Sequence, residues 1–129
     1  MKPTLDMLEF MFERQKWLQV NAYGADPAEL TDEDRKRFAT SMALAINTEV
    51  AEAMQEIAWK PWAKTDHFNR AAFIEELVDI WHFVMNLALL ADCPAHEFYE
   101  IYVQKSGVNV QRQLDGYTGL GKEKASGKL

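Results

Sequence analysis

The chain has 129 residues, of which 48% are hydrophobic and 26% charged, which suits one globular domain and leaves no room for a second of ordinary size. Twenty Asp and Glu residues against fourteen Lys and Arg give a formal charge of −6, so we expect no general affinity for nucleic acid or for an anionic membrane. The longest apolar run, residues 80–91, is too short to cross a bilayer, and Cys93 has no second cysteine to pair with. Since no signal-peptide pattern opens the sequence, these features predict a cytoplasmic protein.

Four segments repeat apolar residues every three or four positions without sustained strict alternation, and each segment predicts a helix. The predicted helices are Thr4 to Tyr23, Asp32 to Trp59, Arg70 to Ala91 and Pro94 to Leu114. We expect Thr31 and Asn69 to cap the second and third helices, and Gly24 to follow the first. The expected fold is an all-α four-helix bundle in a single domain over residues 1–117, followed by a flexible tail rich in Gly, Lys and Ser over residues 118–129.

Carboxylates lie within or beside the apolar faces of two predicted helices. In the third helix Glu76 falls inside an apolar arc and Asp79 lies at its edge, while Glu49 and Glu52 border the apolar side of the second helix. Like charges three residues apart repel each other, and a partly buried carboxylate is costly, so a divalent cation would compensate them best. Four hard oxygen ligands predict Mg²⁺, or Mn²⁺ in its place, rather than zinc. The alternative is that both pairs are solvated acidic faces.

Two glutamines of the first predicted helix, Gln15 and Gln19, also fall in an apolar arc. A buried amide needs hydrogen bonds, and it offers a donor and an acceptor side by side, as the edge of a nucleobase does. Trp59 and Trp62, at the end of the second helix, could stack on such a base. The alternatives are amides that bond to backbone or to each other in an interface, and tryptophans that close the core.

A positive stripe follows from the spacing of Lys105, Asn109 and Arg112, which lie four and three residues apart on the fourth predicted helix. Read alone, this stripe is either a solvated face or an anion site. Beside a carboxylate and metal site, it offers what a polyphosphate needs.

The segments Glu49-Val-Ala-Glu52 and Glu76-Leu-Val-Asp79 resemble the E-x-x-E and E-x-x-D motifs of the all-α nucleoside triphosphate pyrophosphatases, which include MazG-like enzymes and dimeric dUTPases. Asn86 falls where MazG-like enzymes carry an asparagine. Further segments resemble motifs of the dimeric dUTPases, namely Lys60-Pro61-Trp62-Ala63-Lys64, Lys105, Asn109, Arg112-Gln113 and Gly116-Tyr117.

This resemblance implies a Mg²⁺-dependent enzyme that hydrolyses a deoxynucleoside triphosphate, dUTP first, to the monophosphate and pyrophosphate. It implies metal ligation by Glu49, Glu52, Glu76 and Asp79, with Glu49 also acting on the water. The implied phosphate ligands are Lys60, Lys105, Asn109, Arg112 and Tyr117, and the implied base or sugar pocket is Gln15, Gln19, Trp59, Trp62 and Asn86. A homodimer is expected, with a tetramer open. The alternatives are a MazG-like enzyme with another or a broad base preference, and a non-enzymatic helical oligomerisation module.

Overall fold

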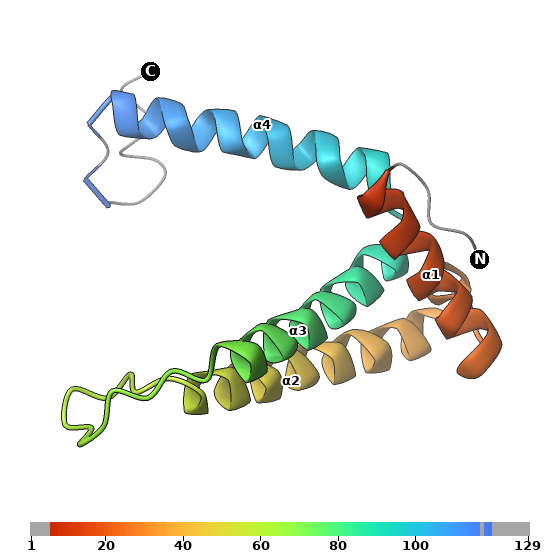
Figure 1. Cartoon of the computed structure of the whole chain (residues 1–129). Helices are drawn as coiled ribbons and strands as arrows, with labels where there is room; N and C mark the ends of the chain where they lie inside the picture. The colour runs from red at the N-terminus through yellow and green to blue at the C-terminus, as the bar shows by residue number, and fades with distance from the viewer. Residues whose placement is uncertain (1–5, 117, 120–129) are drawn as a thin grey trace. The chain divides into compact units, whose positions relative to one another are not determined.

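The computed structural model describes residues 6–116, 118 and 119. These residues form four α-helices and one short 3-10 helix: α1 (Met7–Ala22), η1 (Pro27–Glu29), α2 (Asp32–Gln55), α3 (Arg70–Leu90) and α4 (Ala95–Leu114) (Figure 1). They contain no strand, so the predicted all-α class is confirmed. None of the helices in this described part of the chain combines the length and the hydropathy needed to cross a bilayer.

The chain divides into two units, residues 1–94 and residues 95–129, and each is described by itself. The second unit consists of α4, which runs unbroken through Gly107. A single domain over residues 1–117 stays a prediction, and most of the predicted tail lies outside the described residues.

Helix α3 is the centre of the first unit. It packs along α2 and also contacts α1 and η1 (Figure 1). The buried apolar side chains of this unit come from all three helices: Phe12 of α1, Ala53 of α2, and Met85, Ala88 and Leu89 of α3. Burying a side chain of the size of Phe, Met or Leu stabilises the fold by about 1.5–3 kcal/mol. The core therefore lies along the C-terminal half of α3, where α1 crosses it.

Side chains that accept hydrogen bonds from the first turn set the starts of the helices. Thr31 Oγ1 accepts from the backbone N–H of Asp34 at 3.2 Å, and Asn69 Oδ1 accepts from that of Ala72 at the same distance, so both predicted caps are confirmed. The predicted start of the first helix at Thr4 is wrong, because Asp6 has an extended backbone and caps α1 from outside.

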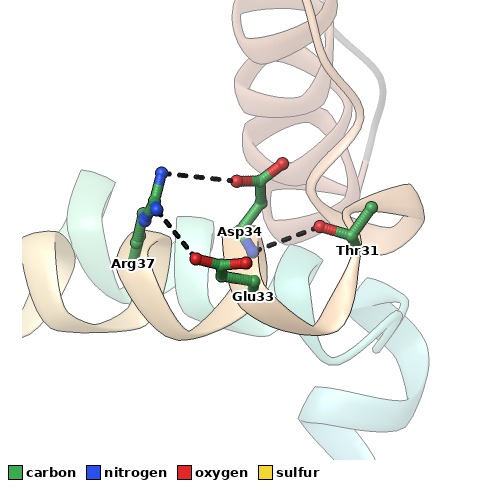
Figure 2. Close-up of polar contacts among 4 residues, drawn as sticks. All are labelled: Thr31, Glu33, Asp34 and Arg37. Atoms are coloured by element: carbon green, nitrogen blue, oxygen red, sulfur yellow. Dashed lines mark hydrogen bonds and ion pairs between the residues drawn. The ribbon is translucent and has the colours of Figure 1, made fainter.

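The first turn of α2 combines this cap with charge. Figure 2 shows Thr31 bonded to the backbone of Asp34, while Arg37 reaches back to Glu33 at 2.8 Å and to Asp34 at 4.0 Å. Acidic side chains at a helix N-terminus interact favourably with the helix dipole. Since the Arg37 side chain is 73% exposed, its ion pairs add at most a few tenths of a kcal/mol, and the cap contributes more.

The second helix is shorter than predicted, ending at Gln55 instead of Trp59. Residues 56–69 form an irregular hairpin, here called the arm, whose base is closed by an antiparallel bridge between Ile57 and Phe68. The ring of His67 donates from Nε2 to the Gln55 carbonyl at 3.2 Å and accepts at Nδ1 from the Thr65 hydroxyl at 2.8 Å. The helix stops because partners within the arm replace the helical partners of its last carbonyls.

Candidate active site

Three carboxylates meet where α2 packs against α3. Glu49 comes from α2, whereas Glu76 and Asp79 come from successive turns of α3. One oxygen from each lies within 4.8 Å of the others. We call these three residues the carboxylate cluster. The structure thus brings together three of the four predicted metal ligands from two consecutive helices.

The cluster leaves negative charge uncompensated. Glu49 Oε2 and Glu76 Oε2 are buried and have no hydrogen-bond partner among the described residues. Ionised carboxylates only accept hydrogen bonds, so neither can satisfy the other. The pKa of Glu49 is raised to about 7, first because its carboxyl shares a proton with that of Glu76, then because burial disfavours its charge, and also because Glu52 lies close. A proton or a cation is needed here.

The donor set fits a hard divalent cation. It consists of carboxylate oxygens alone, which are the ligands that Mg²⁺ and Mn²⁺ prefer. Glu52, the fourth predicted ligand, is exposed and outside the 4.8 Å group, although it is close enough to raise the pKa of Glu49. Beside the cluster, His82 Nδ1 lies 4.0 Å from an Asp79 oxygen, and both side chains are about half exposed.

A cavity of about 550 Å³ adjoins the cluster and shares Asp79 with it. Three helices contribute to its lining, which is formed by Gln15, Leu18, Gln19, Tyr23, Phe38, Met42, Asp79, His82, Phe83 and Asn86. Its volume is in the range of small-molecule sites. Half of these residues are apolar or aromatic, namely Leu18, Tyr23, Phe38, Met42 and Phe83, and the deeply buried polar side chains of the lining are all amides.

The three amides of the cavity differ in their hydrogen bonds. Gln15 Nε2 donates to Asn86 Oδ1 at 2.8 Å, and this bond joins two side chains that are only 4% and 3% exposed. The amide nitrogen of Asn86 also lies 3.4 Å from the sulfur of Met42. Gln19, which is 7% exposed, makes no side-chain hydrogen bond within the described residues. Three of the five residues predicted for the base pocket therefore share one cavity, and their role stays a prediction.

Two lining residues of the cavity, Met42 and Asn86, lie two helical turns from the carboxylates of the cluster. Met42 precedes Glu49 by seven residues on α2, and Asn86 follows Asp79 by seven residues on α3. At 1.5 Å per residue, seven residues correspond to about 10 Å along a helix. The packed pair of helices thus places the Asn86 amide about 10 Å along α3 from Asp79, and α1 supplies the other two amides of the cavity, Gln15 and Gln19.

Other predicted residues lie elsewhere. Trp59 and Trp62 are in the arm, 52% and 72% exposed, and neither lines the cavity. Lys60 is also in the arm, with its Nζ 5.9 Å from the centre of the Trp59 ring. Lys105, Asn109 and Arg112 share one face of α4, in the second unit, and Tyr117 lies outside the described residues.

Sequence analysis missed several lining residues, among them Phe38, Met42 and His82. The seven-residue spacing from Met42 to Glu49 was a usable signal, because residues seven apart lie on the same face of a helix. The contact of α1 with α3, which closes the cavity, has no comparable signal in the sequence.

Comparison with known proteins decides the family. A family model described as dUTPase matches residues 7–100. The chain belongs to this dUTPase family. The matched residues include the whole of α1, α2 and α3, so both the carboxylate cluster and the cavity lie in the part shared with other dUTPase-family members. The predicted relationship to the all-α nucleoside triphosphate pyrophosphatases is thereby confirmed.

A curated relative of this dUTPase-family chain is the dCTP pyrophosphatase of Enterobacteria phage LZ5. The two are 27% identical over 100 residues, which cover 68% of this chain and 56% of the phage protein. The chain thus spans little more than half the length of that relative. No solved structure matches the chain.

Proposed function

We propose that this dUTPase-family protein is a Mg²⁺-dependent pyrophosphatase that hydrolyses dUTP to dUMP and pyrophosphate. The observation that carries the proposal is a carboxylate cluster beside a cavity lined by α1, α2 and α3, in which the buried Asn86 amide lies about 10 Å along α3 from Asp79. A nucleotide has this layout, with a base at one end and phosphates at the other. The family and the name of the phage relative support the same chemistry.

The carboxylates have two roles in this proposal, binding the cation and activating the water. Glu76 and Asp79, with Glu52 nearby, would hold the cation, and the residues fit it because two of the cluster's buried oxygens have no other partner among the described residues. A bound Mg²⁺ neutralises phosphate charge and acidifies water. Glu49, which is the fourth proposed ligand, also orients the attacking water and takes its proton, as a carboxylate beside a metal-bound water can do. The water oxygen bonds to phosphorus as the bond between the α- and β-phosphates breaks.

The remaining residues bind the substrate in this proposal. Gln15, Gln19 and Asn86 face the base within the cavity, and Trp59 and Trp62 stay candidates for stacking. The phosphates would be bound by the positive charges of Lys60, Lys105 and Arg112 and by hydrogen bonds from Asn109 and Tyr117. We also propose a homodimer, with a tetramer as the alternative, which sedimentation analysis would distinguish.

The deciding experiment measures pyrophosphate release from dUTP, dCTP, dTTP, dATP and dGTP and their ribonucleotide forms, with Mg²⁺ and then with EDTA. Turnover of dUTP that EDTA abolishes supports the proposal. Preference for a purine nucleotide would keep the mechanism and favour a MazG-like enzyme. If no nucleotide is turned over and Mg²⁺ leaves the melting temperature unchanged, a helical oligomerisation module becomes the better explanation.

A further inference from the structure

Helix α4 carries a row of exposed apolar side chains on one face. Four large residues, each between 47% and 74% exposed, form this row: Tyr99, Val103, Val110 and Leu114. Their spacing of four, seven and four residues keeps them on the same side of the helix. We call these four residues the apolar stripe. Such a stripe is normally buried against another surface, so its exposure indicates an interaction site.

The middle of the apolar stripe is small and open. Ser106 has a short side chain, and a Cβ added at Gly107 would meet no heavy atom within 4 Å outside the backbone of its own helix. A glycine inside a helix is destabilising relative to alanine, but it allows another backbone to approach closely. A second helix can therefore come nearest to α4 at these two small residues.

The apolar stripe is complementary to itself when two copies of α4 run in opposite directions. Along the helix, the midpoint between Tyr99 and Leu114 falls between the two small residues. The midpoint between Val103 and Val110 falls at the same place. A two-fold axis through this point sets the large side chains of each copy opposite those of the other, and the small residues opposite each other. Self-complementarity of this kind is what a two-fold interface requires.

The charges of α4 favour the same antiparallel arrangement. The first half of the helix carries Glu97 and Glu100, and the second half carries Lys105 and Arg112. Antiparallel copies set the acidic half of each helix beside the basic half of the other, and their helix dipoles are opposed in a favourable sense. Parallel copies would bring like charges together.

The opposite side of α4 does not match itself in this way. It carries Lys105, Asn109 and Arg112, which lie about 140° round the helix from the apolar stripe at about 100° per residue. The same two-fold axis would set Ile101 opposite Arg112 and Val108 opposite Lys105, each an apolar group against a cation. The apolar stripe is thus the face that suits a second copy, and its use leaves the proposed phosphate ligands uncovered.

We propose that two copies of this chain pair through the apolar stripe, with their α4 helices antiparallel about a two-fold axis between Ser106 and Gly107. Four large apolar side chains from each copy are then covered. The proposal rests on the homodimer of the proposed function, for which it names the surface, and it does not depend on the activity.

Disulfide cross-linking in the full-length protein tests the position of the axis. The only cysteine of the sequence is first replaced, as Cys93→Ser, and new cysteines are then introduced. Ser106→Cys places two thiols beside the axis, so mild oxidation should join most of the protein into dimers. Val110→Cys separates them by about 10 Å along the helix, because each thiol faces position 103 of the other copy, and few dimers should form. Adding Val103→Cys to Val110→Cys should restore cross-linking.

Sedimentation over a concentration series measures the contribution of the apolar stripe to assembly. Val110→Glu places a charge within the stripe and should raise the dissociation constant of the dimer at least about tenfold. Val108→Glu is the matched control, because the same residue type, 50% exposed against 57%, is changed on the other side of the same helix. It should change the constant by no more than about twofold. Circular dichroism should show equal helicity in both variants.

The outcomes separate this proposal from the proposed function. If the wild type is a dimer but Val110→Glu weakens it no more than Val108→Glu does, the homodimer stands and the α4 pairing is wrong. Cross-linking of Val110→Cys alone to the same extent as Ser106→Cys would indicate a parallel pair and would also overturn the proposal, as would a failure of Ser106→Cys to cross-link. If the wild type is a monomer, the homodimer and the α4 pairing both fail, whereas pyrophosphate release still decides the activity.

Discussion

The bond between Gln15 and Asn86 allows a quantitative test of how α1 is attached to α3. The two side chains are 71 residues apart in sequence, 4% and 3% exposed, and joined at 2.8 Å. Gln15→Met removes the donor and leaves Asn86 Oδ1 buried without one, which should lower the free energy of unfolding by about 1–3 kcal/mol. Asn86→Leu leaves Gln15 Nε2 unpaired, with a similar expected cost. The double variant removes both groups, so its loss should not exceed about that of one single variant.

The assay is equilibrium unfolding in urea, in EDTA and at one fixed protein concentration, because a bound ion or a partner subunit would add its own stabilisation. An unchanged slope against urea confirms that only stability has altered. Asn21→Leu is a matched control on an exposed side chain of α1 and should change stability by less than about 0.5 kcal/mol. Losses that add in the double variant to within about 0.3–0.5 kcal/mol would refute the reasoning, since they would show that the two amides are not coupled.

Three further predictions concern the cluster and the helix starts. Glu76→Gln should lower kcat/KM by at least about 100-fold, measured by pyrophosphate release, because the variant loses a metal ligand. Without metal the same variant should be more stable to urea, because its amide can donate a hydrogen bond to Glu49. Loss of activity without this gain in stability would contradict the structure. Because the pKa of Glu49 is raised from 4.5 to about 7, its protonated form contributes stability that is complete below pH 4.5 and lost as the pH rises through 7. In EDTA the melting temperature should therefore fall more between pH 5 and 8 in the wild type than in Glu49→Gln, and equal falls would exclude this assignment. Thr31→Ala should cost about 1 kcal/mol in urea unfolding and Arg37→Ala at most a few tenths, an order that would reverse if the exposed ion pairs mattered more than the cap.

Much of the fold could be predicted because its signals are local. Periodicity located four helices, and the side chains of Thr31 and Asn69 fixed two starts to the residue. The end of α2 could not be predicted in this way. Apolar periodicity continues past Gln55 to Trp59, and the helix stops because His67, twelve residues further on, returns to bond the Gln55 carbonyl.

In the candidate site, too, local features could be predicted from the sequence and contacts between helices could not. Glu76 was identified as anomalous because it falls inside an apolar arc, and the packing of α2 on α3 then brings Glu49 to it. The partner of Gln15 could not be predicted. Sequence analysis left backbone groups, the other glutamine and a nucleobase open as partners, and the structure pairs Gln15 with Asn86 of α3 instead.

The bridge at the base of the arm has an evolutionary consequence. The pairing of Ile57 with Phe68 is accompanied by backbone bonds from Ala58 to His67 at 2.9 Å and from Asn69 to Glu56 at 2.8 Å. Residues 59–66, beyond the bridge, are all exposed. Insertions or deletions there would lengthen or shorten a tip that is already closed at its root, and the alignment of α2 with α3 would be preserved. The arm is thus a place where relatives can diverge in length while the carboxylates two turns away keep their spacing.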